Sequence, residues 1–320
     1  MKNNTNNFIF DTVVNTLAAL GMRQGGTATK ACTIISSLLR TYGVTFNIEG
    51  YSTEMPVWKK CVLRVDGKSI PALPTGFTSG TFDRVTAYVS SLVSSHYFLD
   101  VPHINFNPHS RVISRANFSF APSCAVAVDS LSALFKARSL KGEIKVEKKV
   151  QTTYQILVGN RKNPTAIVFS HFDSIGPGTI DNASGTALML QAIINKPECL
   201  NETLFVFDGN EEVSYDYPVY WGKGYRNFEK KYPRLILKAR KIIVVDCIGY
   251  APTEVLKKGP IIRLAFPIAD IQKFKSKISL ITSDYDSLMP VYHSADDIPV
   301  NIRKHFVLEA LSKLTEAMSA

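Results

Sequence analysis

The stretch T-A-I-V-F-S-H-F-D-S-I-G-P-G-T-I-D-N-A-S-G-T-A-L-M-L (165–190) sets the fold class of this 320-residue chain. It opens with a compact apolar run at 165–171, and near-continuous apolarity is typical of a strand that is covered on both faces. Its last part starts an apolar segment, 183–194, whose hydrophobic residues recur at helical spacing. We therefore predict a buried strand, a short polar turn and a buried helix.

The same alternation continues on both sides of this stretch. Compact apolar runs bounded by turns predict further strands at 154–160, 203–209, 241–247 and 277–283. A final helix is expected at 301–318, with Asn301 as its N-cap. Strands that alternate with helices indicate an α/β sandwich.

The chain before residue 150 has a different character. An amphipathic helix is predicted at 28–42, where Gly43 ends it, and a short surface helix is predicted within residues 1–21. From about 50 to 149, short β-type runs are broken by Pro, Gly and Ser, which predicts a β-rich insert with its own small core.

The expected elements of this insert are strands at 57–65, 103–106, 124–128 and 143–150 and helices near 82–96 and 129–139. Residues 1–49 and 150–320 would form the second domain. His96, His103 and His109 have no acidic partners at ligand spacing, so we interpret them as structural or surface residues.

Composition narrows the functional classes. Apolar residues make up 45% of the chain and charged residues 20%, as in a globular protein. No apolar stretch approaches the roughly 20 residues of a membrane span, so no membrane partner is expected. The net charge of +10 favours either an anionic partner or a solvated basic surface. Because the basic residues are spread out and no nucleic-acid motif accompanies them, we expect no nucleic-acid binding.

Five cysteines, odd in number and far apart, contain no CxxC spacing. Reduced thiols in a cytoplasmic protein are the simplest interpretation of this pattern.

Acidic and histidine side chains follow several of the predicted strands. In open α/β sheets the ligand site lies at the carboxyl ends of the strands. His171 and Asp173 close one strand, Glu211 and Glu212 follow another, and Asp246 ends a third. Two further candidates lie elsewhere: Asp181 opens the helix after 165–171, and His293 lies in a late loop.

Each of these candidates also has an ordinary structural explanation. Asp173, two residues from His171, can accept the second ring N–H of that histidine, but an isolated pair of this kind also occurs at strand ends without metal. Glu211 and Glu212 diverge, so that one can bind metal while the other faces a cleft, or both can lie in a solvated loop. Asp181 is also a fair helix cap.

Together, two histidines and three carboxylates suffice for two divalent metal ions that share one carboxylate. Nitrogen and oxygen ligands without cysteine suit zinc, with cobalt or manganese as alternatives. Two such ions can activate a water molecule and polarise a carbonyl, and an uncommitted glutamate such as Glu211 would take the proton of that water.

The chain resembles the co-catalytic di-zinc aminopeptidases, a group that also holds glutaminyl cyclase, glutamate carboxypeptidase and the transferrin receptor ectodomain. The middle of the chain, notably 122–160, resembles the protease-associated type of insert. The motifs that carry the resemblance are G-M-R-Q-G-G-T (21–27), S-H-F-D-S (170–174), I-D-N-A-S-G (180–185), F-D-G-N-E-E (207–212), V-V-D-C-I-G (244–249) and V-Y-H-S-A-D-D (291–297).

The resemblance implies a mixed, mainly parallel central sheet sandwiched by helices, and a role for each motif residue. Asp181 would bridge two zinc ions, His171 and Asp246 would complete one site, and Glu212 and His293 the other. Glu211 would be the general base, and Asp173 would orient His171. The peptide bond after the bridging aspartate is often cis in this family. The D-N-A-S-G motif favours the two-metal peptidases over glutaminyl cyclase, which binds one zinc.

Two departures concern substrate preference. The G-S turn that usually follows the glutamate pair is replaced by an aromatic stretch (213–225), and Ala269-Asp270 stands where the family has Ser-Asp. The aromatic residues are either substrate-pocket candidates or packed core: Tyr215, Tyr217, Tyr220, Trp221 and Tyr292.

We therefore expect a cytoplasmic metallo-aminopeptidase that hydrolyses the N-terminal peptide bond of peptides by metal-activated water. The alternatives are a glutaminyl cyclase-like acyl transferase, a carboxypeptidase and a non-catalytic binding homologue. The preferred N-terminal residue, the physiological metal and the oligomeric state stay open.

Overall fold

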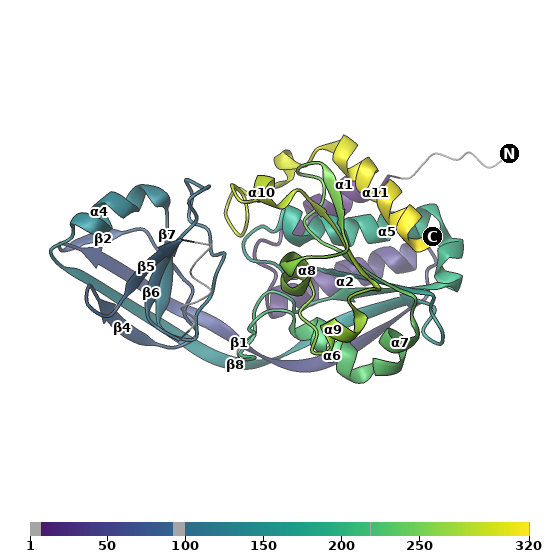
Figure 1. The fold of residues 1–320 in the computed structure, drawn as a ribbon, viewed down its shortest axis with the longest axis horizontal. Helices are drawn as coiled ribbons and strands as arrows, with labels where there is room; N and C mark the ends of the chain where they lie inside the picture. Colours follow the sequence, from purple (N-terminus) through teal and green to yellow (C-terminus); the bar gives the residue numbers. More distant parts are fainter. Residues whose placement is uncertain (1–7, 92–99, 218, 320) are drawn as a thin grey trace.

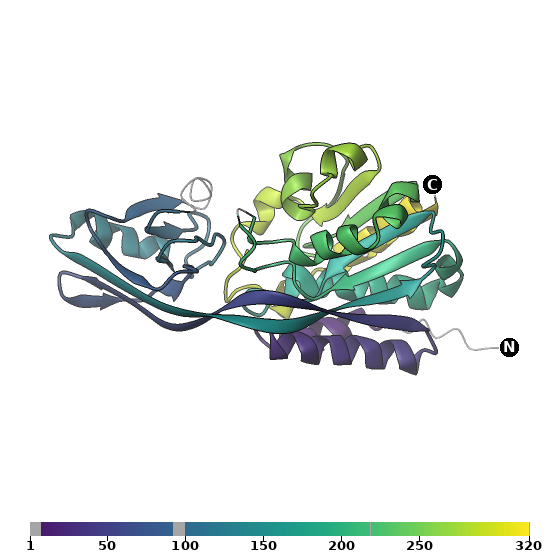
Figure 2. The same ribbon diagram turned by 90° about the horizontal axis from the view of Figure 1, so that it is seen from below.

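The computed structural model describes residues 8–91, 100–217 and 219–319. Figure 1 shows a larger lobe that contains α1 and α11 and a smaller lobe joined to it by two long strands. These strands, β1 (Phe46–Val65) and β8 (Leu140–Gly159), pair antiparallel over almost their whole lengths. The chain thus enters and leaves the small lobe on one twisted ribbon, which Figure 2 shows from below.

One sheet extends through the larger lobe. Its strand order is β12 (Thr253–Leu256), β13 (Ile278–Ser283), β11 (Lys241–Val245), β9 (Ala166–His171), β10 (Thr203–Asp208), β8, β1 and β2 (Lys68–Ile70), with β4 (Gly80–Asp83) beside β8. The strands from β13 to β10 are parallel, and β12 and β8 pair antiparallel on either side of them. Every residue of β9 and β10 is buried, because helices cover both faces.

The helices form two layers that enclose this sheet. One layer packs on the first face through a shared apolar core and consists of α1 (Phe10–Ala18), α2 (Gly26–Thr41), α5 (Gly185–Asn195) and α11 (Lys304–Ser319). The other layer covers the opposite face and consists of α6 (Lys223–Lys231), α7 (Pro233–Lys238), α8 (Pro260–Ala265) and α9 (Ile271–Phe274). The predicted α/β fold, a mixed and mainly parallel sheet between helices, is confirmed.

The small lobe has its own four-stranded sheet. Its strand order is β3 (Leu73–Pro74), β7 (Ser123–Val126), β6 (His103–Phe106) and β5 (Tyr88–Ser91). An apolar core lies between this sheet and the end of the ribbon, and η2 (Val128–Ser130) and α4 (Leu131–Lys136) pack beside it. The division into a catalytic domain and an insert at 50–149 stays a prediction, since β1 and β8 cross both expected boundaries without a break.

Four local predictions are corrected. The expected helix near 82–96 is wrong for its described part, because that segment pairs into sheets as β4 and β5; His96 lies outside the described residues. Runs 143–150 and 154–160 belong to one strand, β8. The first helix is packed into the core and not superficial. Asn301 does not cap the last helix, since it ends η5 (Pro299–Asn301) and α11 starts at Lys304.

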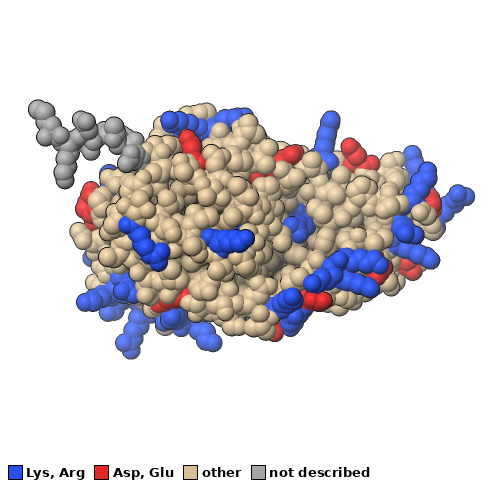
Figure 3. Space-filling view, turned by 180° about the vertical axis from the view of Figure 1, so that it is seen from behind, with Lys and Arg blue, Asp and Glu red and all other residues tan. Residues whose placement is uncertain are grey.

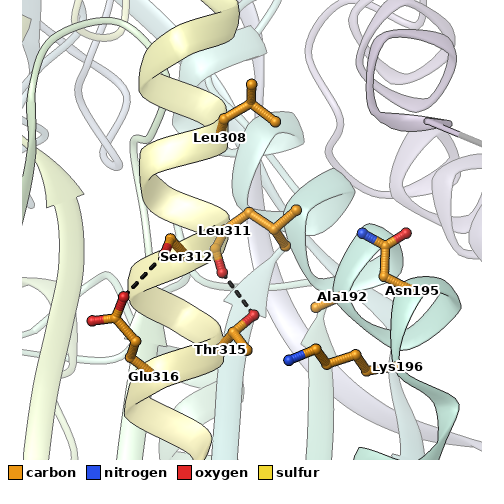
Figure 4. Close-up of a pocket in the computed structure, with 8 residues that line it drawn as sticks. All are labelled: Ala192, Asn195, Lys196, Leu308, Leu311, Ser312, Thr315 and Glu316. Atoms are coloured by element: carbon orange, nitrogen blue, oxygen red, sulfur yellow. Dashed lines mark hydrogen bonds between the residues drawn. The ribbon is translucent and has the colours of Figure 1, made fainter. Parts of the chain in front are cut away.

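A surface pocket lies between α5 and α11 (Figure 4). The side chains of Ser312 and Thr315 bond within their own helix there, to Glu316 and to the Leu311 carbonyl. None of the predicted site residues lines this pocket. It is a gap in helix packing, remote in the fold from the carboxyl ends of the parallel strands.

The distribution of surface charge and the lengths of the apolar helices are those of a globular protein. Figure 3 shows Lys and Arg over both lobes of one face, with acidic residues among them. Within the described residues, no helix combines the length and apolarity needed to cross a membrane. The absence of nucleic-acid binding stays a prediction.

Candidate metal centre

Five elements that are far apart in sequence bring the predicted ligands together. His171 ends β9, and Asp246 directly follows its parallel neighbour β11. Glu212 lies in the loop after β10, which pairs with the other side of β9. Asp181 lies in η3 (Thr179–Ser184) before α5, and His293 in the loop after α10 (Tyr285–Leu288). Because parallel strands end at the same sheet edge, these side chains converge there.

The first group consists of His171, Asp181 and Asp246. The Nε2 atom of His171 lies 3.2 Å from Asp181 Oδ1 and 3.4 Å from Asp246 Oδ1. The three candidate ligand atoms all lie within 4.8 Å of one another. Asp246 Oδ1 is buried and has no hydrogen-bond partner among the described residues. A cation would compensate the negative charge of this buried, unpartnered oxygen.

The second group shares Asp181 and adds Glu212 and His293. His293 Nε2 lies 3.0 Å from Asp181 Oδ2 and 3.0 Å from Glu212 Oε2. One oxygen of Asp181 therefore faces each histidine, which is the arrangement a bridging carboxylate requires. The sequence-predicted sets, His171–Asp181–Asp246 and Asp181–Glu212–His293, are the two groups that the fold assembles.

Asp173 connects His171 to the glutamate loop. The Nδ1 atom of His171 is 3.2 Å from the Asp173 carbonyl and 3.4 Å from its carboxylate. The carboxylate also accepts the backbone N–H groups of Glu211 and Glu212 and the side-chain amide of Gln24 at 3.1 Å. Asp173 thus lies beside the imidazole that it was predicted to orient, and it also holds the loop of the glutamate pair.

Glu211 is buried beside these groups without being a member of either. Burial raises the pKa of Glu211 well above its ordinary value, and the neighbouring carboxylate of Glu212 raises it further. Burial likewise raises the pKa of Glu212 to about 7. For His171 and His293, burial lowers the pKa, but the surrounding carboxylates raise it by more. Both pKa values therefore lie well above the usual range.

Two further residues support the centre, and our sequence reasoning assigned them no role. Asp297 accepts the backbone N–H groups of Ile180 at 2.6 Å and Asp181 at 3.2 Å, which fixes the turn that presents Asp181. The fully buried guanidinium of Arg23 donates to the carbonyls of Phe172 at 2.6 Å, Pro177 at 2.6 Å and Gly178 at 2.7 Å. Arg23 and Asp297 both lie in motifs that carry the family resemblance, and this was the only feature of the sequence that could have identified them.

The peptide bond between Asp181 and Asn182 is cis, as the family resemblance implies. The Asn182 side chain donates to Ser170 Oγ at 3.1 Å and to the Val245 carbonyl at 2.9 Å, and it accepts from the Gly185 N–H. These bonds tie the Asp181 turn to β9 and β11.

The aromatic candidates divide into three kinds. Tyr215, Tyr220 and Trp221 pack in an aromatic cluster where β1, the small lobe and the glutamate loop meet. Tyr217 is 66% exposed and donates to Asp100. Tyr292 stacks on the His293 ring at a centroid distance of 3.9 Å. Because its ring contacts His293, a member of one of the two groups, Tyr292 stays a substrate-binding candidate.

The donor set fits zinc. It consists of imidazole nitrogens and carboxylate oxygens in a buried place, with more negative than positive charge around it. Cys247 is the nearby thiol, but burial raises its pKa well above the ordinary value, and the adjacent carboxylates of Asp181 and Asp246 raise it further. This favours the protonated thiol, and Cys247 belongs to neither of the two ligand groups.

Residues 153–263 match the model of Peptidase family M28. No curated protein matches the chain. The motif-based resemblance to the co-catalytic zinc peptidases is confirmed by this match together with the likeness to solved structures described next.

Solved structures of both zinc aminopeptidases and glutaminyl cyclases resemble the whole chain. A zinc aminopeptidase from Bacillus subtilis aligns with a TM-score of 0.67 at 15% identity, covering 96% of this chain and 93% of its own. An aminopeptidase from Aneurinibacillus sp. strain AM-1 has a TM-score of 0.61 at 15% identity, with 96% and 92% covered. The glutaminyl cyclase of Fimbriiglobus ruber has a TM-score of 0.55 at 11% identity, with 99% and 96% covered. At these identities the likeness establishes the fold.

Proposed function

We propose that this chain is a metal-dependent aminopeptidase that holds two zinc ions and hydrolyses the N-terminal peptide bond of peptides. The observation that carries the proposal is the position of Asp181, whose two oxygens lie 3.2 Å and 3.0 Å from the Nε2 atoms of His171 and His293. Cobalt or manganese would satisfy the same donor set. The family match supports the coarser assignment as a metallopeptidase.

Each residue of the centre has a task in this proposal. His171 and Asp246 would hold one ion, Glu212 and His293 the other, and Asp181 both. When bound, the two zinc ions supply polarisation of the substrate carbonyl and a lowered pKa for water. Glu211 would take a proton from that water and deliver it to the leaving amine, a role that its raised pKa favours. Asp173 would keep the His171 ring and the Glu211 backbone in place.

A glutaminyl cyclase is the second candidate, because solved glutaminyl cyclases share the fold. The two ligand groups that meet at Asp181 favour the aminopeptidase, since the motif resemblance implies two zinc ions for the peptidases and one for glutaminyl cyclase. We further propose the cytoplasm as the compartment, on the spacing of the five cysteines, all of which are free. Localisation of the tagged protein in intact cells tests this point.

The test of the function combines metal analysis with substrate screening. We expect two zinc ions per chain and release of nitroaniline from aminoacyl-nitroanilides, lost with a chelator and restored by zinc. N-acetylated versions should not be cleaved, because a free α-amine is required; a carboxypeptidase would instead cleave N-acetylated dipeptides that carry a free C-terminal carboxylate. Cyclisation of N-terminal glutamine with release of ammonia, without hydrolysis of any nitroanilide, would instead establish the cyclase.

A further inference from the structure

The two histidines of the candidate centre are oriented by different parts of the molecule. Asp173, in the same motif as His171, faces the Nδ1 atom of that ring. For His293, Nδ1 lies 3.2 Å from the backbone carbonyl of Arg115, which belongs to the small lobe. This carbonyl is the one hydrogen-bond partner of His293 Nδ1 within the described ranges. A metal-binding histidine normally needs such a partner to fix its tautomer.

A carbonyl oxygen only accepts hydrogen bonds, so a His293 ring that binds a cation through Nε2 would donate its Nδ1–H to the Arg115 carbonyl. Its Nε2 lone pair is then directed at Asp181 and Glu212, as a metal ligand requires. Nε2 is buried, and the groups 3.0 Å from it are the carboxylate oxygens that would share the cation with it. The Arg115 carbonyl therefore selects the tautomer that leaves Nε2 free for a cation.

Arg115 is held against His293 by a seam between the lobes, formed by residues 107–115 and 289–294. The Arg115 N–H donates to the His293 carbonyl at 3.0 Å, and Ser114 and Ser294 form an antiparallel bridge. Ser114 Oγ donates to the Tyr292 carbonyl at 2.7 Å, and Asn107 Nδ2 donates to the Met289 carbonyl at 2.7 Å.

His293 needs this support because its backbone is unfavourable. Its φ of 48° is a left-handed conformation, which is unfavourable for a residue with a side chain. The seam contacts both the backbone and the ring of this residue. The His171 strand end has no contact of this kind with the small lobe among the residues described.

We propose that the small lobe supports the metal centre by holding His293 in place, with Arg115 as the positioning residue. This inference rests on the proposed function, since it assigns a task to a ligand of that centre. Docking of the small lobe should therefore set the zinc affinity of the Asp181–Glu212–His293 group and leave the His171–Asp181–Asp246 group unchanged.

The test loosens the seam without altering a ligand or Arg115. The double variant Asn107→Ala/Ser114→Ala removes the two bonds that side chains of residues 107–115 donate across the seam. Its matched control is Asn105→Ala/Ser123→Ala, which removes two buried residues of the same types that bond to Thr75 inside the small lobe. Each double variant is placed in two single-group backgrounds: His171→Ala, which leaves the His293 group, and His293→Ala, which leaves the His171 group.

Zinc affinity is measured by competition with a chelating dye. We expect the seam variant to weaken zinc binding about 10–100-fold in the His171→Ala background and less than about twofold in the His293→Ala background. The control double variant should change neither. Equal losses in both backgrounds, or no loss in the first, would overturn the inference while wild type still binds two zinc ions.

Hydrogen exchange on the metal-free protein provides a readout that requires no zinc. In the seam variant, exchange should accelerate in residues 289–294 and stay unchanged in β9, which also shows that the variant folds. The single variant Ser114→Ala should give a smaller effect in the same place. Uniform acceleration in both segments would overturn the inference. A wild-type protein that binds no zinc, with residues 289–294 protected, would contradict the proposed function itself.

Discussion

The Oδ1 atom of Asp173 accepts the backbone N–H of Glu211 at 2.9 Å. The same carboxylate lies 3.4 Å from Nδ1 of His171. One buried aspartate thus links the ring of a proposed ligand to the backbone of the proposed general base. A change at this position should disturb both.

Asp173→Asn replaces one of the two acceptor oxygens by an N–H₂ group. Because that group faces a backbone N–H, the glutamate loop loses a bond and gains a repulsive contact. We expect zinc affinity to fall about 10–100-fold, measured by chelator competition. Asp286→Asn, an exposed position on α10, is the control and should bind zinc as wild type does.

Glu211→Gln should keep the zinc content of wild type but lower kcat by about 10²–10⁴-fold, the range for losing a general base. Glutamine has the same shape and cannot accept the proton. Metal analysis and steady-state kinetics on one preparation check this. Wild-type kcat in the variant would remove Glu211 from its proposed role.

Asp181→Ala should lose both zinc ions together, because each ligand group loses its shared member. Asp296→Ala, an exposed carboxylate in the last motif, serves as the control. Metal content after dialysis against a fixed free-zinc concentration is the measurement. Retention of two ions per chain would show that Asp181 does not bridge.

Much of the fold and of the site followed from local patterns, and the failures have tertiary causes. Strands such as 165–171 were predictable because burial on both faces leaves only apolar residues there. The β8 strand was predicted as two, since its polar middle, near Gln151, pairs with β1 in a way that no local pattern encodes. The support of His293 by Arg115 was unpredictable, because a backbone carbonyl carries no residue-specific signal.

Tyr220→Phe should destabilise the junction of the lobes. Its buried hydroxyl accepts the Phe118 N–H at 3.1 Å, so its removal leaves a buried donor unpaired, at a cost of about 1–3 kcal/mol. Tyr217→Phe is the matched control: its hydroxyl bond to Asp100 is exposed, and the change should stay within about 0.5 kcal/mol. The free energies of unfolding of both variants, measured in urea, test this prediction. Equal values would contradict it.

Asp208→Asn should alter the pH dependence of stability. Burial raises the pKa of Asp208 to about 7, with a further contribution from Asp173. A folded-state pKa above the unfolded value contributes stability at low pH, and this contribution is lost as pH rises from about 4 to about 7.

Asparagine does not titrate, and its carbonyl can still accept the bond that Asp208 takes from Tyr51. The free energy of unfolding of the variant, relative to that of wild type, should therefore rise by roughly 1–4 kcal/mol between pH 4 and pH 8. Unfolding free energies measured across that range check this, and parallel curves for the two proteins would refute the raised pKa.

The unbroken run of β1 alongside β8 has an architectural consequence. Phe46 pairs with Val158 at one end of the ribbon and Val65 with Leu140 at the other, so partners more than 70 positions apart must meet before the central sheet gains its β1 edge. Excising the small lobe would call for a new hairpin, for instance a tight turn between the register partners Pro56 and Lys148. Such a shortened chain would keep the larger lobe but lose the contacts from the small lobe that hold His293 in place.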